Sequence, residues 1–212
     1  MVSQKECPQE INPILTNVSP QERLRKRSTI VRAEQIDLAS DQPSQYLRLL
    51  RDPVNSAHFN PVPRDVDELI RELKTSGLHG VVGKNLLEEP VGYSKLRDPQ
   101  PGRNDTWIEG LVIENDLQNK GGENEFHAGS QFLEEIIKYA FSTPTHDGRM
   151  RIKVNAAVIK DIPNWERACG VFERSGFRKL GTYEDQVEVL GEMKDVEVFE
   201  LKRSAWEERR SM

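Results

Sequence analysis

Cysteine and histidine are scarce in this chain, and their scarcity excludes several classes of protein. The 212 residues contain two cysteines, Cys7 and Cys169. A disulfide scaffold or a structural zinc site needs clustered thiols or imidazoles, so neither is expected. The four histidines are scattered and lack the spacing of metal ligands: His58, His79, His127 and His146. The sequence therefore predicts no metal cofactor.

Long apolar runs and basic surplus are also missing. No segment reaches the roughly 18 consecutive apolar residues of a membrane-spanning helix, and the first residues lack the apolar core of a secretory signal. The formal net charge of −5 argues against a nucleic-acid binder. The basic cluster Arg23–Arg27 lacks the interleaved aromatics that stack on single strands. We expect a cytoplasmic enzyme or binding protein, with neither membrane nor nucleic acid as partner.

The sequence divides into three parts. Residues 1–27 read as a polar extension, in which Ser19-Pro20-Gln21-Glu22 is a typical helix start. Residues 28–203 carry the regular pattern of a folded domain, and residues 204–212 read as a C-terminal tail. At about 100–200 residues per domain, the length fits one domain with additions.

Apolar periodicity predicts alternating strands and helices within the domain. The expected strands are 29–32, 78–84, 90–97, 106–114, 151–159, 177–190 and 196–202, and the expected helices are 37–51, 65–76, 129–141 and 164–175. A helix separates strands 106–114 and 151–159, so these two strands are predicted to be parallel neighbours with a right-handed crossover. The glycine-bearing loop before helix 129–141 presents free backbone N–H groups, which favour phosphate.

Two motifs, in the same order, resemble those of the GNAT superfamily of N-acetyltransferases. Leu111-Val112-Ile113 is followed by Gln118-Asn119-Lys120-Gly121, and Gly129-Ser130 matches the closing glycine and the helix start after an insertion of about six residues. Further along, Asn164 precedes Phe172-Glu173-Arg174-Ser175-Gly176-Phe177, which is similar to the aromatic-Glu-x-x-Gly-Phe string of the family. The resemblance spans about residues 29–203.

The resemblance implies an α/β fold in which a mixed, mostly antiparallel sheet has one splayed parallel strand pair and is flanked by helices. It implies an acyltransferase that moves an acetyl group from acetyl-CoA to the amine of a small molecule or peptide. The implied cofactor-binding residues are Leu111, Val112, Ile113, Gln118, Gly121, Gly129, Ser130 and Asn164.

Glu109 is the candidate general base, because the amine must be neutral to attack a thioester and family enzymes often place a base on this strand. Alternation along the strand puts Trp107, Glu109, Leu111 and Ile113 on one face. The alternative is a carboxylate that simply faces solvent. Phe172 stands where many family members have the tyrosine credited as general acid, and nothing in the sequence selects Tyr139 or Tyr183 instead. Cys169 falls on an apolar helix face and is expected in the core.

Acidic residues are in surplus around the expected cofactor site. Residues 104–147 contain nine acids and two bases, which favours a cationic acceptor such as a polyamine, an aminoglycoside-like molecule or a peptide amine. The same acidic loop, the interrupted glycine motif and Phe172 support an alternative, a non-catalytic GNAT-fold protein that senses acyl-CoA or binds other proteins. The sequence leaves a homodimer open.

Overall fold

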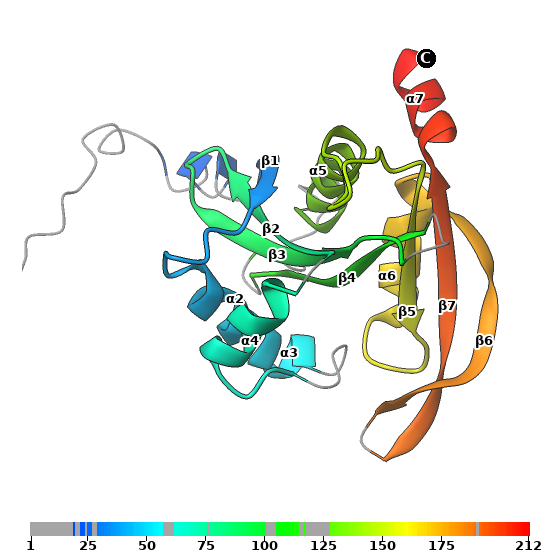
Figure 1. The fold of residues 1–212 in the computed structure, drawn as a ribbon, viewed down its shortest axis with the longest axis horizontal. Helices are drawn as coiled ribbons and strands as arrows, with labels where there is room; N and C mark the ends of the chain where they lie inside the picture. The colour runs from blue at the N-terminus through cyan, green and yellow to red at the C-terminus, as the bar shows by residue number, and fades with distance from the viewer. Residues whose placement is uncertain are drawn as a thin grey trace, which may run out of the picture.

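The computed structural model describes residues 19, 22–23, 25–26, 29–56, 62–75, 77–100, 105–114, 117, 128–189 and 191–212, with the backbone alone for Val54 and Ser56. Its centre is a seven-stranded sheet of order β1-β2-β3-β4-β5-β7-β6 (Figure 1). The strands are β1 (Ile30–Gln35), β2 (Leu78–Asn85), β3 (Pro90–Arg97), β4 (Thr106–Ile113), β5 (Lys153–Ile159), β6 (Arg178–Val189) and β7 (Glu192–Lys202). The helices are α2 (Gln42–Arg51), α3 (Pro53–Ser56), α4 (Val66–Leu73), α5 (Ala128–Ser142), α6 (Trp165–Arg174) and α7 (Arg203–Ser211).

The sheet is mixed, as predicted. β4 and β5 are parallel neighbours joined through α5, and the other neighbouring strands are antiparallel. The β4–β5 pairing covers three residue pairs, from Thr106↔Val154 to Ile108↔Ala156. Beyond Ile108 the two strands separate (Figure 1). The predicted splayed strand pair is therefore present.

A bulge interrupts β4 immediately after the separation begins. Gly110 has a φ of 62°, a backbone conformation that glycine adopts without steric cost. The β3–β4 register shifts here, since Tyr93 pairs with Val112 while Lys95 pairs with Glu109. A bulge changes which face the following side chains occupy.

The bulge makes one sequence expectation wrong. Strict alternation placed Glu109 on the same face as Leu111 and Ile113. In the structure Leu111 and Ile113 pack into the core beneath α5 and α6, whereas Glu109 pairs with Arg97 and Val112 joins the core beneath α2 and α4. The inserted residue shifts the alternation by one position.

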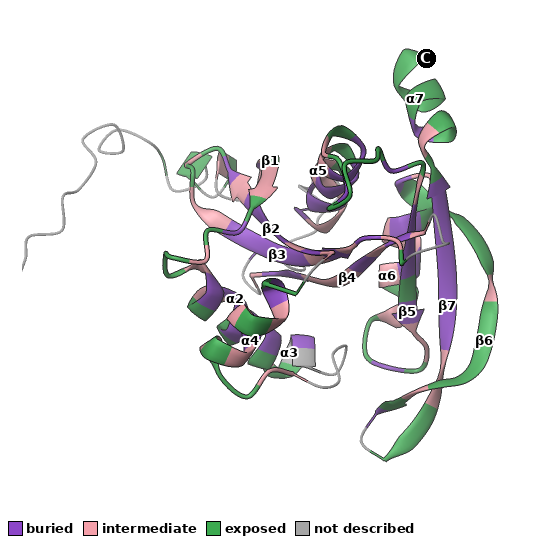
Figure 2. Cartoon of the chain, in the orientation of Figure 1, coloured by how far each residue is buried: buried purple, intermediate pink, exposed green. Residues whose placement is uncertain are grey.

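Two hydrophobic layers cover the sheet (Figure 2). One contains α5, α6 and the buried Trp206 of α7, packed on β4, β5 and β7. The other contains α2 and α4, packed on β2, β3 and the end of β4. Asp65 caps α4, where its Oδ1 accepts a hydrogen bond of 2.7 Å from the Glu68 N–H, as the capping-box pattern predicts.

A pair of glycines lets α5 lie close against the sheet. Gly83 and Gly92 face each other across β2 and β3, and the fully buried ring of Phe132 sits over both of them. A Cβ added at Gly83 would lie 2.6 Å from the ring, and one added at Gly92 would lie 2.8 Å from it. The missing side chains therefore create the notch that holds α5.

The last helix, α7, has no counterpart in the sequence expectation for residues 204–212. Trp206 is buried against Phe141, with ring centroids 5.2 Å apart. Arg203 donates a hydrogen bond to the Phe141 carbonyl near the end of α5, and Arg209 donates one of 3.1 Å to the Arg174 carbonyl at the end of α6. These bonds satisfy carbonyls that helix ends leave free.

Most of the N-terminal extension lies outside the described residues. The described part contains the predicted helix start, since the Glu22 N–H donates a hydrogen bond of 3.1 Å to Ser19 Oγ.

Candidate active site

The point where β4 leaves β5 is the centre of the candidate site. Glu109 is the first residue of β4 beyond the last β4–β5 pair, and the bulge follows it. Two buried hydroxyl groups hold the bulge: Ser94 Oγ donates to the Glu109 carbonyl at 3.1 Å, and the Tyr46 hydroxyl donates to the Gly110 carbonyl at 3.2 Å. Neighbouring elements thus satisfy backbone groups that a regular ladder would have paired.

The candidate base Glu109 is bound by an arginine that sequence reasoning did not identify. Arg97 Nε lies 2.5 Å from Glu109 Oε1, and Arg97 Nη2 lies 3.0 Å from Oε2. The hydrogen bonds to Glu109 raise the pKa of Arg97. The side chains are 43% and 31% exposed. Glu109 is therefore neither a buried acid nor a free solvated carboxylate.

A second ion pair lies beside the first on the same face. Lys95, which is opposite Glu109 in the strand register, has its Nζ 2.6 Å from Glu72 Oε1 on α4. Burial raises the pKa of Tyr46, and the negative charges of Glu72 and Glu109 add to that effect. Two cations and two carboxylates, alternating in charge, therefore lie beside the point where β4 separates from β5.

The start of α5 adjoins the end of β4. A Cβ added at Gly129 would meet Ile113 Cδ1 at 3.2 Å, so the two predicted cofactor-binding segments lie in contact. Ser130 Oγ is buried and has no hydrogen-bond partner among the described residues. The first turn, Ala128–Gln131, carries no acidic side chain. The N–H groups of a helix start, a buried hydroxyl and the absence of an acid in this turn suit a phosphate group here. Gln118 and Gly121 lie outside the described residues.

The remaining predicted residues occupy the region after β5. Asn164 is the N-cap of α6, has a φ of 64° and makes no side-chain capping bond, and it is exposed. Phe172 is buried between Phe177 and Phe199, at centroid distances of 5.2 and 5.6 Å. It serves the core and has no group that can donate a proton. Burial raises the pKa of Tyr139, and Tyr183 is half exposed on the edge strand β6.

Cys169 is buried in the core, as expected. Its thiol donates to Glu197 Oε2 at 3.2 Å, and burial together with this carboxylate raises the pKa of Cys169 to about 12. Such a thiol is a poor nucleophile at neutral pH.

Among the described residues, arginines from outside residues 104–147 pair with three acids of that segment. Arg97 binds Glu109, Arg48 on α2 lies 3.2 Å from Glu114, and Arg149 pairs with Asp147. Within the segment, Lys138 pairs with Glu135. A tally along the sequence misses the partners contributed by β3 and α2, because they come from outside the segment.

Solved structures similar to this chain include N-acetyltransferases. A spermidine N-acetyltransferase from Vibrio cholerae, in complex with CoA and spermine, has a TM-score of 0.65 and 14% sequence identity, over 82% of this chain and 96% of its own. A spermidine/spermine N-acetyltransferase from Vibrio cholerae, in complex with manganese ions, has a TM-score of 0.63 and 15% identity, over 87% and 98%. This chain has the GNAT fold.

The relation to the GNAT fold is carried by structure. No protein-family model and no curated protein matches the sequence. The helices of the described residues include none long and apolar enough to span a membrane. These residues also contain no cluster of three or more His, Cys, Asp or Glu able to hold a metal ion.

Two histidines of this chain, His79 and His146, bind the carboxylate of Asp98. His79 Nε2 lies 2.8 Å from Asp98 Oδ2, and the His146 N–H donates to the same oxygen at 2.6 Å. The other Asp98 oxygen binds Arg151, whose side chain is fully buried. Arg151 also donates to the carbonyl of Ala140 in the last turn of α5 and to that of Thr143 just after it. This cluster ties the ends of β3 and α5 together.

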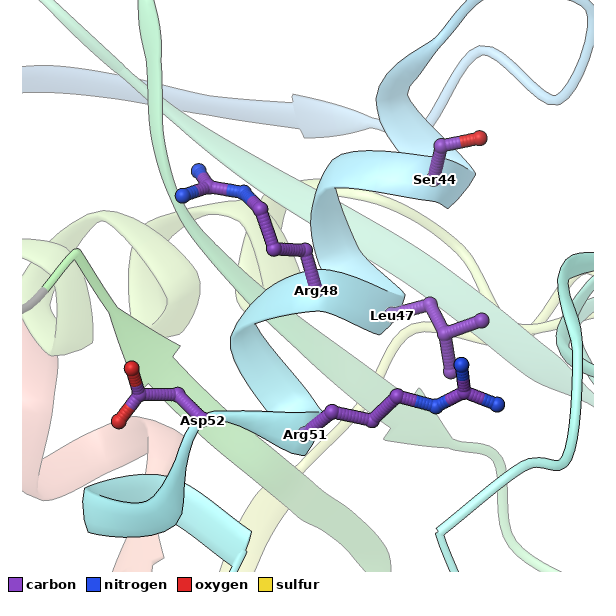
Figure 3. A pocket seen from close by; sticks show the side chains of 5 residues that line it. All are labelled: Ser44, Leu47, Arg48, Arg51 and Asp52. Atoms are coloured by element: carbon purple, nitrogen blue, oxygen red, sulfur yellow. The ribbon is translucent and has the colours of Figure 1, made fainter.

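An open pocket of about 360 Å³ lies along α2. It is lined by Ser44, Leu47, Arg48, Arg51 and Asp52. Arg48 and Asp52 point to one side of the helix and Arg51 points to the other (Figure 3). Arg48 pairs with Glu114, and Arg51 donates to the carbonyls of Pro63 and Arg64. The protein itself engages both arginines, so we assign no ligand to this pocket.

Proposed function

We propose that this protein is an N-acetyltransferase that moves an acetyl group from acetyl-CoA to an amine. The observation that carries the proposal is the fork in the sheet: β4 leaves β5 after three residue pairs, bulges at Gly110 and ends against the start of α5. A strand that diverges from its neighbour can offer backbone groups to an extended ligand, and a helix start offers amides to an anion.

The proposed donor site runs from the point where β4 separates from β5 to the start of α5. Backbone groups of Leu111, Val112 and Ile113 would bind the pantetheine arm, with Asn164 beyond the other strand. Gly129 and Ser130, together with Gln118 and Gly121 of the preceding loop, would bind the pyrophosphate. The Ser130 hydroxyl, which is buried and has no partner among the described residues, and the acid-free first turn of α5 support this assignment.

The reaction needs one base on the acceptor side. The amine nitrogen attacks the thioester carbonyl, the C–N bond forms, the C–S bond breaks, and the nitrogen loses a proton. Glu109 would accept this proton once Arg97 has moved from its carboxylate. The departing sulfur is an alkyl thiol, a class that ionises far more readily than an amine, so it can leave as a thiolate and be protonated by solvent. Phe172 is thus compatible with turnover.

Thermal unfolding with and without acetyl-CoA tests the proposal. A ligand at about 100 times its dissociation constant adds roughly 2.7 kcal/mol to stability, so the melting temperature should rise. Gly129→Asp places a carboxylate in the first turn of α5 and should weaken the effect. Gly181→Asp is the matched control, since no atom lies within 4 Å of a Cβ at Gly181. No melting shift and no heat of binding at millimolar acetyl-CoA would sink the proposal.

A second function is favoured by the occupied carboxylate of Glu109 and by the core role of Phe172. In this reading the protein binds acyl-CoA without turnover, as a sensor or as a module that binds other proteins. Acetyl-CoA binding with no acetylated product across a broad amine panel would support it. Loss of a detected activity in Glu109→Gln would exclude it.

The acceptor, the cellular location and the oligomeric state expected from the sequence are proposals. A cationic acceptor was inferred from the acidic surplus, and the ion pairs of Glu109 and Glu114 weaken that basis. A cytoplasmic location and a homodimer remain predictions, to be checked by fractionation and by sedimentation.

A further inference from the structure

We propose that the Arg97–Glu109 pair is the acceptor-recognition site, and that it selects an acceptor carrying both an amine and a carboxylate, such as an amino acid, over a polyamine. The inference rests on the proposed function and names its substrate class.

The pair is placed and exposed as a recognition site requires. Glu109 is the first β4 residue past the fork, and Arg97 is the last residue of β3. Both oxygens of the carboxylate are engaged, at 2.5 and 3.0 Å. The two side chains remain 43% and 31% exposed. An ion pair at such exposure contributes little to stability, so a ligand can open it at little cost.

Opening the pair has different consequences for different ligands. An amine that takes the place of Arg97 at both oxygens of Glu109 displaces the guanidinium. A polyamine then leaves Arg97 without a carboxylate. Glu72, the other acid whose charge acts on Arg97, is already 2.6 Å from Lys95. An amino acid gives each residue of the pair a new partner, because its ammonium group binds Glu109 and its carboxylate binds the guanidinium of Arg97.

The surrounding charges favour the same ligand. Lys95, Arg97, Glu72 and Glu109 alternate in sign and sum to zero. A polyamine is bound best by a surplus of carboxylates, whereas a zwitterion is complementary to one cation beside one anion. Arg also suits carboxylate better than Lys does, because its planar fork gives two parallel hydrogen bonds. The bound ammonium group releases one proton to solvent, and the neutral amine then gives a second proton to the adjacent Glu109 as the C–N bond forms.

The test compares matched ligands on the full chain. Calorimetry in the presence of CoA, and initial rates with acetyl-CoA, would use a panel of L-amino acids, the corresponding amino-acid amides and spermine. The amides keep the amine and lose the carboxylate. We expect at least one amino acid to bind tenfold or more tightly than its amide and than spermine.

Variants separate recognition from structure. Arg97→Gln should raise the dissociation constant or KM of the preferred amino acid at least tenfold, whereas its amide and spermine should both bind better because Glu109 is freed. The dissociation constant of Arg97→Lys for the preferred amino acid should lie between those of the unchanged protein and Arg97→Gln. Arg149→Gln, which removes another exposed Arg–carboxylate pair, should change none of these values.

Each outcome decides the proposal. Spermine or the amides binding as well as every amino acid would overturn it, as would an equal loss for amino acids and amides in Arg97→Gln. Absence of binding by every probe would also overturn it. If acetyl-CoA fails to bind while an amino acid binds through Arg97, the proposed transferase activity is lost but the recognition site stands.

Discussion

The glycine notch beneath α5 gives a sharp test of how this fold positions its donor site. In Gly83→Ala the new methyl group would lie 2.6 Å from two carbons of the Phe132 ring. Ordinary contact begins at 3.4 Å, so ring and sheet must separate by about 0.8 Å. Overpacking of this kind costs typically about 1–3 kcal/mol. For a domain of this size we expect a fall in melting temperature of roughly 2–4 °C per kcal/mol.

The assay is urea unfolding of a double-mutant cycle. Phe132→Leu alone should destabilise the protein by leaving a void, though by less than the about 3–5 kcal/mol of a Phe→Ala change. In the double variant the alanine methyl fills part of that void. The two changes should therefore be non-additive, with a favourable coupling of about 1 kcal/mol or more. Gly181→Ala, at a glycine with open space around it, is the control and should be nearly neutral.

Strict additivity within about 0.3–0.5 kcal/mol would refute the notch as the feature that fixes α5. The cycle has a functional readout as well. Because α5 begins beside Ile113, a displaced helix should weaken acetyl-CoA binding in Gly83→Ala, and Phe132→Leu should restore part of it.

Two further predictions concern stability. Asp98→Asn leaves the buried Arg151 without its carboxylate and should cost about 3–5 kcal/mol in urea unfolding. Although burial alone would raise the pKa of Asp98, bonds from His79 and the His146 N–H and the charge of Arg151 lower it. The stabilisation from Asp98 is therefore complete above about pH 4 and is lost as the pH falls through the lower pKa that Asp98 has in the native state. The variant should lack this acid-dependent loss of stability. Parallel pH profiles of stability for the two proteins would contradict the prediction. Trp206→Ala should cost about 3 kcal/mol by calorimetry, because α7 loses its buried anchor; an unchanged melting temperature would mean that α7 packs independently of it.

Much of the sheet could be predicted from sequence because its strands are short, apolar and bounded by turn residues. The strand 90–97 has the predicted bounds. The parallel pair around α5 follows from the strand–helix–strand order. The start of α2 was placed too early, since Asp37 forms a local turn in which its Oδ1 accepts from the Ala39 N–H at 2.9 Å. Side-chain bonding of this kind competes with helix formation.

Two features of the site escaped the sequence, although one of them had a signal. A glycine inside a strand often marks a bulge, and Gly110 did so here. The sequence prediction instead assumed that side chains alternate between the two faces of the strand without interruption at Gly110. Arg97 had no comparable signal, because its position opposite Trp107 depends on the register of β3 and β4. Eight residues, 98–105, separate those strands, and a long connection leaves the register open. α7 was missed because Trp206 is the one large apolar residue within Arg203–Ser211, a segment rich in charge.

The strand order has a consequence for synthesis of the chain. β7 lies between β5 and β6 although it is made after both of them. While residues 192–202 are still inside the ribosome, β6 has no neighbour and β5 has an open edge. Exposed strand edges pair readily with other chains. A nascent chain stalled before Glu192 should therefore be captured by chaperones or aggregate, whereas one released beyond Lys202 can close its sheet.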